Sequence, residues 1–184
     1  MACLDLETSE LFRSGESWLR EAGRLGPVLD LACGRGRHAL ATARLGLSVL
    51  ALDRSDQALR VLQRTASARV QCVRTDLEAG FGIPVAPASC GAILVFRFLF
   101  RPLAPAIFEA LKPGGLLLYE TFTTRQRSLA QGPKNPAFLL EPGELARLFA
   151  ALDPLRYEEV VTKGPRPAAL ARLAARRRSS AQLA

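Results

Sequence analysis

The stretch Val28-Leu29-Asp30-Leu31-Ala32-Cys33-Gly34-Arg35-Gly36-Arg37 decides the fold of this 184-residue chain. Its apolar first half predicts a buried β-strand, Gly34-Arg35-Gly36 predicts a tight turn, and residues 37–45 predict a helix that ends at Gly46. The two glycines allow the backbone to come close to a ligand, and the helix that follows offers free N–H groups at the positive end of its dipole. We therefore expect the first ligand-binding unit of an α/β domain here.

The alternation of strand and helix continues around this stretch. A helix is expected over about residues 5–25, stopped by Gly26-Pro27, and a turn is expected at 112–115. Strands separated by helices favour a mainly parallel sheet covered on both faces, which is a three-layer αβα architecture. Further strands are predicted at 48–52, 70–75, 91–96 and 116–120.

The C-terminal part of the chain is less regular. Apolar residues at helical spacing predict a last amphipathic helix over 145–152. Residues 155–162 can form a strand, whereas residues 168–178 have helical propensity on their own. The residues of this segment alone therefore do not decide whether it is a strand or a helix.

Composition argues against several classes of protein. With 49% hydrophobic and 23% charged residues, the chain has the make-up of one globular domain, residues 1–184. No run approaches the ~18 apolar residues of a membrane span, and acids stand where a signal peptide needs basic residues, so we expect a cytoplasmic protein without a membrane partner. Four cysteines without CxxC spacing and a single histidine, His38, argue against a metal site and a Ser-His-Asp hydrolase.

Two carboxylates accompany the glycine turn. Asp53 ends the second strand 19 residues after Gly34, where it can accept two hydrogen bonds from a ribose diol. The segment from Gly34 to Ala39 also has the G-x-G-x-x-A form that dinucleotide-binding proteins share. Asp30, however, lies just before the turn, where its charge repels a phosphate and attracts an amino group or a sulfonium. The sign of this charge favours S-adenosylmethionine over NAD as the ligand.

Four segments, in their order and spacing, resemble the motifs of class I S-adenosylmethionine-dependent methyltransferases. The resemblance covers about residues 28–122, and the first of the four is the opening stretch, of the form D-x-[GA]-x-G-x-G. The other three are Ala51-Leu52-Asp53-Arg54-Ser55, Thr75-Asp76-Leu77 and Leu111-Lys112-Pro113-Gly114-Gly115-Leu116-Leu117.

This resemblance implies a fold and a division of the chain. The fold would be a Rossmann-like, doubly wound, mainly parallel seven-stranded sheet with an antiparallel last strand. Residues 168–175 would then be a strand, against their own propensity. We accordingly divide the single domain into an N-terminal helical cap (1–26), a Rossmann-like core (27–175) and a basic tail (176–184).

A narrower resemblance concerns the small-molecule methyltransferases of the tellurite-resistance and thiopurine type. It rests on the compact size of the chain and on the segment from Cys33 to Arg37. The segments Tyr119-Glu120-Thr121-Phe122 and Gly132-Pro133-Lys134-Asn135-Pro136 also resemble uncharacterised bacterial members of that group.

The family resemblance implies how the first motif would bind the methionine portion of the cofactor. Asp30 would hold its amino end, while Ala32, Gly34 and Gly36 let it approach the backbone. Arg37 would pair with the methionine carboxylate, or else remain a solvated arginine in the first helical turn.

The later motifs would bind the nucleoside and the methyl group. Asp53 would accept the ribose hydroxyls, with Arg54 beside the adenine. The adenine amino group would donate to Asp76, and Leu77 would donate its backbone N–H to the base. Phe96, at the end of the fourth strand, would flank the methyl group.

The sequence departs from the family pattern in three places. Ala32 replaces the commoner glycine, which we expect to cost little because its methyl group is small. Gly91 stands where many relatives begin the fourth strand with Asp, so that supporting contact is missing. Phe96-Arg97-Phe98-Leu99 replaces the Asn-Pro-Pro-Tyr type of motif with which many relatives methylate exocyclic amines of nucleobases.

Four residues near strand ends are candidates for the substrate side. Arg97 follows an apolar strand, where a guanidinium needs an anionic partner, and this suggests an anionic group on the substrate. Thr121 lies at the end of the fifth strand, and Tyr119 beside it is either a substrate contact or a core aromatic. His38 is either a catalytic base or a structural histidine. In-line methyl transfer requires no acid–base pair, so no catalytic residue is assigned.

The net charge of +8 raises the question of a nucleic-acid partner. Part of the surplus lies in the C-terminal arginines 172, 176, 177 and 178, for which a solvated tail is the simpler reading. That segment has no aromatic residue for base stacking, which disfavours RNA as a partner but does not exclude it. Three hypotheses follow: a methyltransferase of a small molecule, a methyltransferase of RNA or protein, and a non-enzymatic nucleotide- or NAD(P)-binding protein.

Overall fold

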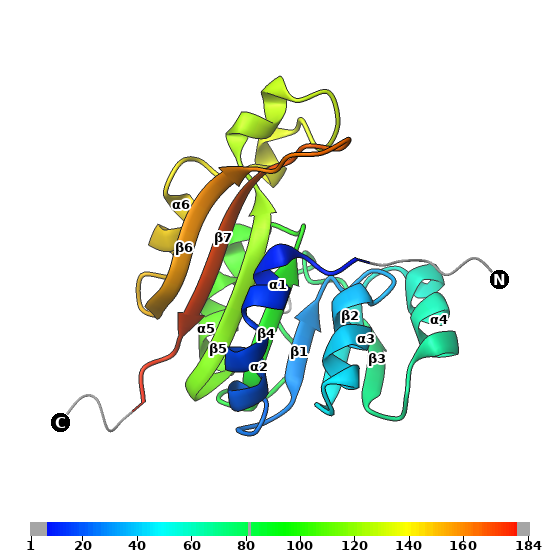
Figure 1. Cartoon of the computed structure of the whole chain (residues 1–184). Helices are drawn as coiled ribbons and strands as arrows, with labels where there is room; N and C mark the ends of the chain where they lie inside the picture. The colour runs from blue at the N-terminus through cyan, green and yellow to red at the C-terminus, as the bar shows by residue number, and fades with distance from the viewer. Residues whose placement is uncertain (1–6, 81, 180–184) are drawn as a thin grey trace.

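The computed structural model describes residues 7–80 and 82–179, and a seven-stranded sheet runs through the whole of it (Figure 1). The strand order is β3-β2-β1-β4-β5-β7-β6, in which β1 to β5 are parallel and β7 is antiparallel to both of its neighbours. The predicted sheet is therefore confirmed. The strands are β1 (Val28–Leu31), β2 (Val49–Asp53), β3 (Val70–Arg74), β4 (Cys90–Phe96), β5 (Leu111–Phe122), β6 (Asp153–Val161) and β7 (Ala169–Arg176).

Helices cover both faces of the sheet. Because side chains alternate along a strand, β4 sends Ala92 and Leu94 toward one face and Ile93 and Val95 toward the other. Helices α1 to α4 pack on the first face, and α5 and α6 pack on the second. The helices are α1 (Glu10–Ser14), α2 (Glu16–Ala22), α3 (Arg37–Arg44), α4 (Asp56–Thr65), α5 (Ala104–Ala110) and α6 (Glu144–Leu148).

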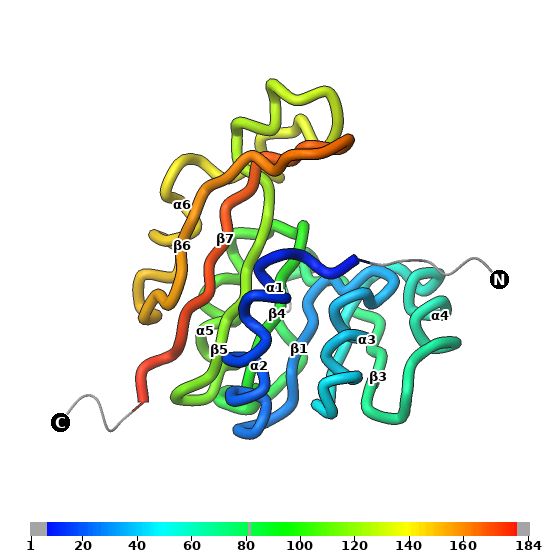
Figure 2. The backbone as a smooth tube through the Cα atoms, in the orientation of Figure 1, coloured from blue at the N-terminus to red at the C-terminus, as the bar shows by residue number. Residues whose placement is uncertain are grey.

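The described residues also form three short 3-10 helices: η1 (Arg101–Leu103), η2 (Thr124–Ser128) and η3 (Pro136–Phe138). The segment that carries η2 and η3 connects β5 to α6. It stands beyond the end of β5, yellow-green in Figure 1, and the backbone trace in Figure 2 shows that it lies beside the turn between β6 and β7.

The single N-terminal helix predicted over 5–25 is divided in two, and residues 1–6 lie outside the described part of the chain. Ser9 caps α1 by accepting a hydrogen bond from the N–H of Phe12. Gly15 ends α1 and begins α2, and a Cβ at this glycine would lie 3.2 Å from Leu118 of the sheet. The break therefore lets both short helices lie close to β4 and β5.

The predicted turn at 112–115 is an irregularity inside β5. Leu111 pairs with Cys90 of β4, and the next pair is Leu116 with Ala92, so the four intervening residues bulge out of register. The missing aspartate at Gly91 has a structural reason here, because a Cβ at this position would lie 2.2 Å from the carbonyl oxygen of Ala22. Close packing of α2 against β4 leaves no room for a side chain.

The strand that the family resemblance implied at 168–175 is confirmed as β7. It lies between β5 and β6 and is buried along almost its whole length, so cross-strand pairing on two sides overrides the helical propensity of its residues. The described part of the basic tail is not a free solvated segment. Arg176 pairs with Glu21, Arg178 pairs with Asp153, and Arg177 donates to main-chain carbonyls at the end of α5.

Candidate active site

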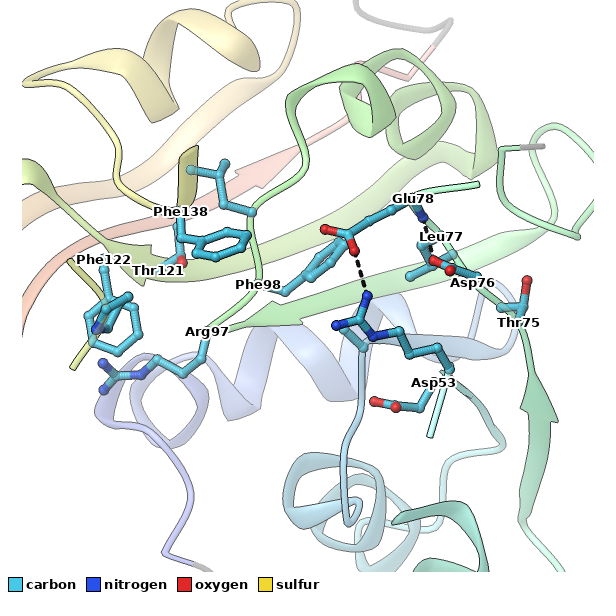
Figure 3. Close-up of a pocket in the computed structure, with 14 residues that line it drawn as sticks. Asp53, Thr75, Asp76, Leu77, Glu78, Arg97, Phe98, Thr121, Phe122 and Phe138 are labelled. Atoms are coloured by element: carbon cyan, nitrogen blue, oxygen red, sulfur yellow. Dashed lines mark hydrogen bonds and ion pairs between the residues drawn. The ribbon is translucent and has the colours of Figure 1, made fainter. Parts of the chain in front are cut away.

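A cavity of about 410 Å³ opens at the carboxyl ends of the parallel strands, where open α/β sheets bind ligands (Figure 3). Its wall has two parts of different chemistry. We call the first the carboxylate half, and it is lined by Ala32, Asp53, Arg54, Thr75, Asp76, Leu77 and Glu78. We call the second the aromatic half, and it is lined by Arg97, Phe98, Leu99, Thr121, Phe122, Pro133 and Phe138.

Backbone N–H groups fix the two aspartates of the carboxylate half. Asp53 accepts a hydrogen bond from the N–H of Gly34 at 2.7 Å on one oxygen and from Ser55 at 2.8 Å on the other. Asp76 accepts one from the N–H of Glu78 at 3.0 Å. Each carboxylate is thereby held at a strand end with lone pairs left for a ligand.

An ion pair that the sequence reasoning missed lies at the edge of this half. Arg54, expected beside the adenine, donates to Glu78 at 2.8 Å, and the dashed line in Figure 3 marks this contact. Glu78 follows directly after the third motif, but nothing in the sequence pairs residues that lie 24 positions apart. The pair is largely exposed, so its contribution to stability is small.

The glycine turn leaves a buried carboxylate beneath it. Asp30 is 2% exposed, and its Oδ2 has no hydrogen-bond partner among residues 7–80 and 82–179. Burial raises the pKa of Asp30 to about 7, against the opposing effects of a backbone hydrogen bond at Ala39 and the charge of Arg37. A Cβ at Gly34 would meet nothing within 4 Å, so the space over the turn is open. Asp30 is not among the residues that line the cavity, but a buried carboxylate with an unpaired oxygen close to the glycine turn fits a cationic group such as an ammonium.

The backbone of Ala32 is strained, although its side chain is small. Its φ is +52°, in the left-handed region that favours glycine, so the expected small cost depends on the backbone conformation and not only on the size of the methyl group. The methyl group clashes with the neighbouring backbone rather than with other side chains, and this costs about 1 kcal/mol. Gly36 is left-handed too, and a Cβ there would lie 2.3 Å from a methyl group of Leu62.

Arg97 occupies the aromatic half and already has an anionic partner. Its backbone N–H donates to the carbonyl of Glu120 at 2.8 Å, and its Nε lies 3.4 Å from Oε1 of the same residue. The guanidinium also lies over the ring of Phe122, 4.6 Å from its centre. The protein itself therefore supplies the anionic partner that this arginine was expected to need. Sequence reasoning passed over Glu120, although a glutamate inside an apolar strand could have indicated a buried partner.

Two predicted residues, His38 and Phe96, lie away from the cavity wall. His38 is 2% exposed, accepts a hydrogen bond from the N–H of Ser9, and stacks on Phe96 with ring centres 3.7 Å apart. Burial and the charges of Arg37 and Arg97 lower the pKa of His38 to about 2, so the ring stays neutral. Phe96, expected to flank the methyl group, instead packs under α1. These positions fit structural roles.

Of the remaining candidates, Thr121 lines the cavity, and Tyr119 and Arg37 do not. The hydroxyl of Tyr119 donates to the carbonyl of Phe98 at 3.1 Å, its ring packs near Phe149, and burial raises its pKa. Its position is that of a core aromatic. Arg37 is half-buried and reaches the carbonyl of Glu7 at 3.4 Å. Within the described residues, no three His, Cys, Asp or Glu side chains gather to hold a metal ion, and no helix is long and apolar enough to cross a membrane.

Comparison with known sequences finds similarity over part of the chain. Residues 28–115 match a family described as a methyltransferase domain. A ubiquinone biosynthesis O-methyltransferase of Methylocella silvestris is 29% identical over 154 residues, which cover 72% of this chain and 59% of that protein. An uncharacterized RNA methyltransferase of Parasynechococcus marenigrum is 32% identical over 108 residues, which cover 56% of this chain and 23% of that protein. The chain spans less than two thirds of either relative.

Comparison with solved structures agrees. An S-adenosylmethionine-dependent methyltransferase from Mesorhizobium loti matches with a TM-score of 0.73 and 17% identity, covering 94% of this chain and all of that one. TehB from Haemophilus influenzae, of the tellurite-resistance type expected from the sequence, matches with a TM-score of 0.70 and 19% identity, covering 89% of this chain and 62% of that one. The domain match over residues 28–115 and the likeness of the fold make this chain similar to S-adenosylmethionine-dependent methyltransferases, and its fold is that of their class I.

Proposed function

We propose that this chain transfers a methyl group from S-adenosylmethionine to a small-molecule acceptor. The observation that supports this most is the carboxylate of Asp30, which is buried beside the open glycine turn without a hydrogen bond to its Oδ2 from any described residue. A buried carboxylate is stabilised by a cation, and the ammonium group of the methionine portion would supply one. The pyrophosphate of NAD would be repelled at the same place.

The carboxylate half would hold the nucleoside. Asp53 has lone pairs left for the ribose hydroxyls beyond the hydrogen bonds that it accepts from the backbone. Asp76 accepts one backbone hydrogen bond, on Oδ1, and its other oxygen is available to the adenine amino group. The backbone N–H of Leu77 donates to no described residue, which leaves it for the base. Arg54 and Glu78 would border the adenine.

When bound, S-adenosylmethionine supplies an electrophilic methyl carbon, which the acceptor's lone pair attacks while the electrons of the carbon–sulfur bond pass to sulfur. The contribution of the chain is to orient the acceptor and to exclude water. Phe98, Leu99 and Phe122 provide apolar wall for both tasks. No histidine stands among the residues that line the cavity, and the proposal assigns no general base to the chain.

Binding of S-adenosylhomocysteine, the product form of the cofactor, tests this proposal by calorimetry. We expect saturable binding of S-adenosylhomocysteine and none of NAD at the same concentrations. Tighter binding of NAD would instead favour the nucleotide-binding hypothesis. Transfer of a labelled methyl group into the small-molecule fraction of a cell extract, and not into its RNA or protein, would identify the class of acceptor.

RNA is the second candidate, because one relative is described as an RNA methyltransferase. The described arginines of the C-terminal segment are engaged within the fold, for example Arg176 with Glu21 and Arg178 with Asp153, and this disfavours a free basic arm. A titration with single-stranded RNA at low salt, before and after deletion of residues 176–184, would test it. Binding that is lost on the deletion would support the RNA hypothesis.

A further inference from the structure

Three phenylalanines from separate segments meet in the aromatic half of the cavity. Phe98 follows β4, Phe122 ends β5, and Phe138 belongs to η3, and all three line the same wall (Figure 3). Phe138 is 46% exposed, which is unusual for a large apolar side chain at a cavity. Exposed aromatic surface in a concave site is typical of places where a flat ring binds.

The segment that carries Phe138 is firmly attached to the fold. Arg101 donates to the carbonyls of Ala137 at 3.1 Å and Leu139 at 2.8 Å, and its guanidinium also pairs with Glu144. The side chain of Asn135 accepts a hydrogen bond from the N–H of Ala137 and so caps η3. Phe138 is therefore held over the cavity before any ligand arrives, which lowers the entropic cost of binding.

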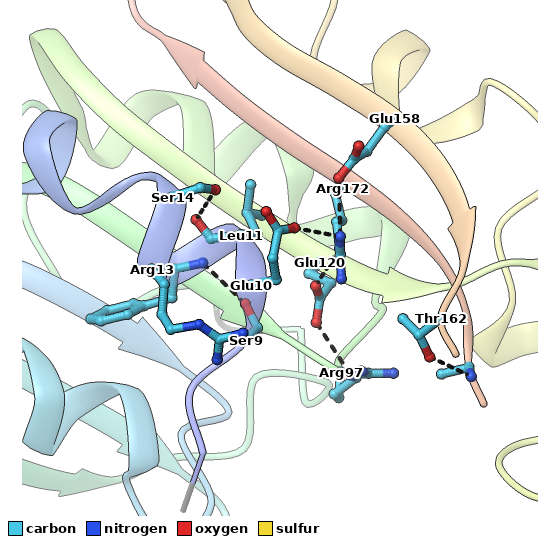
Figure 4. A network of polar contacts seen from close by, with 12 residues as sticks. Ser9, Glu10, Leu11, Arg13, Ser14, Arg97, Glu120, Glu158, Thr162 and Arg172 are labelled. Carbon is cyan, nitrogen blue, oxygen red and sulfur yellow. Dashed lines mark hydrogen bonds and ion pairs between the residues drawn. The ribbon is translucent and has the colours of Figure 1, made fainter. Parts of the chain in front are cut away.

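Arg97 adds a positive charge beside one of these rings, that of Phe122, in a conformation that the fold enforces. Its φ is +63°, a left-handed value that is strained for a long side chain. Glu120 holds it there through both its carbonyl and its carboxylate, and Figure 4 shows this contact. A strained residue that is held so closely at a cavity is a candidate for ligand recognition.

The carboxylate that holds Arg97 is shared and leaves most of the guanidinium free. Glu120 is fully buried and also accepts from Arg172 at 2.8 Å, and Arg172 in turn contacts Glu10 and Glu158 (Figure 4). The two Nη groups of Arg97 have no hydrogen-bond partner among residues 7–80 and 82–179. A guanidinium edge with unused N–H groups matches a carboxylate, which can accept two parallel hydrogen bonds.

From this juxtaposition we infer that the acceptor is a planar aromatic molecule that carries a carboxylate. Its ring lies among Phe98, Phe122 and Phe138, and its carboxylate pairs with the Nη groups of Arg97. The inference rests on the proposed function, since it assigns the carboxylate half of the cavity to the cofactor. It adds the chemical class of the methyl acceptor, which must have both an aromatic ring and a negative charge.

The test is calorimetric titration of the protein saturated with S-adenosylhomocysteine, using three probes. These are 2-naphthoate, its neutral analogue 2-naphthamide, and the non-aromatic cyclohexanecarboxylate. We expect 2-naphthoate to bind at least tenfold more tightly than either of the others. Equal binding of the amide would overturn the role of Arg97, and equal binding of the saturated acid would overturn the role of the rings.

Variants sharpen the test. Arg97→Gln should weaken 2-naphthoate binding at least tenfold and leave 2-naphthamide unaffected, while Arg97→Lys should retain part of the affinity. Arg125→Gln, which removes an exposed arginine of η2 outside the cavity wall, is the matched control and should change nothing. If Arg97→Gln fails to fold, Phe138→Leu replaces it, because that side chain is exposed; it should weaken 2-naphthoate several-fold.

Two kinds of failure are distinguishable. If S-adenosylhomocysteine binds but the probes show no preference for the aromatic carboxylate, the inference about the acceptor is wrong and the proposed function stands. If S-adenosylhomocysteine does not bind to the folded protein, the proposed function itself fails, and the acceptor inference fails with it.

Discussion

The two halves of the cavity are built in different ways. The carboxylate half comes from short segments that follow β2 and β3, and backbone N–H groups hold its aspartates in place. The aromatic half is gathered from β4, β5 and η3, and a buried chain of charges around Glu120 holds its arginine. Local backbone geometry therefore fixes one half and long-range tertiary contacts fix the other, so the two halves should respond differently to mutation.

The largest expected difference lies in stability. Glu120→Ala removes a fully buried carboxylate and leaves Arg97 without its partner, so we expect a loss of about 3 kcal/mol in the free energy of unfolding. Glu78→Ala breaks the exposed pair with Arg54 and should cost at most about 1 kcal/mol. Urea denaturation of the two variants measures this difference. Equal losses would show that the buried network does not hold the aromatic half.

The second prediction concerns the pH dependence that the buried carboxylate of Asp30 gives to the protein without cofactor. Asp30 keeps its proton in the folded state up to about pH 7 but loses it near pH 3.8 when unfolded. Since the folded state binds more protons between these values, burial of this group makes stability fall as the pH rises from about 4 to 7. Asp30→Asn should remove that loss and stabilise the free protein at pH 8 by on the order of 2–4 kcal/mol.

Thermal and urea unfolding at pH 5 and pH 8 would measure the effect of Asp30→Asn. The exposed Asp56→Asn serves as the control and should not show this pH dependence. The stabilised variant should at the same time lose affinity for S-adenosylhomocysteine, because its amide cannot pair with an ammonium group. Destabilisation of equal size at both pH values would mean that Asp30 is ionised and paired in the free protein.

The third prediction concerns the ribose contact. Asp53→Ala should weaken S-adenosylhomocysteine binding by about 1–3 kcal/mol, as expected for lost hydrogen bonds to a charged group. In the aromatic half, Phe138→Leu should leave this affinity unchanged. Calorimetry on both variants compares the two halves directly, and unaltered binding in Asp53→Ala would remove this aspartate from the ribose site.

The sequence predicted the carboxylate half better than the aromatic half for a physical reason. Asp53 ends β2, Asp30 is one residue before the end of β1 and Asp76 lies two residues after β3. The parallel arrangement of the strands is therefore enough to bring them to one edge. Phe138 reaches the cavity through the path of a long loop. Its position depends on Arg101 and Glu144, which lie 43 residues apart in sequence.

The same reason explains where local sequence alone was a poor guide to the fold and the site. Residues 168–178 favour a helix locally, but pairing with β5 and β6 makes β7 a strand, and only the family resemblance anticipated this. His38 and Phe96 lie near the motifs in sequence, yet they face α1 rather than the cavity. Which way a side chain points at a strand end depends on the neighbouring layer, and sequence spacing does not contain that information.

The smallest predicted effect tests the strain within the glycine turn. Ala32→Gly should relieve the left-handed backbone at φ +52° and stabilise the protein by up to about 1 kcal/mol, since the greater flexibility of glycine in the unfolded chain offsets part of the gain. Ala39→Gly, in the buried part of α3, is the matched control and should destabilise by about 1 kcal/mol, because glycine is unfavourable inside a helix. Differential scanning calorimetry of both variants would show melting temperatures that shift in opposite directions. A fall in both would mean that the methyl group of Ala32 makes packing contacts that outweigh the strain, and the carboxylate half would then depend on side-chain packing as much as the aromatic half does.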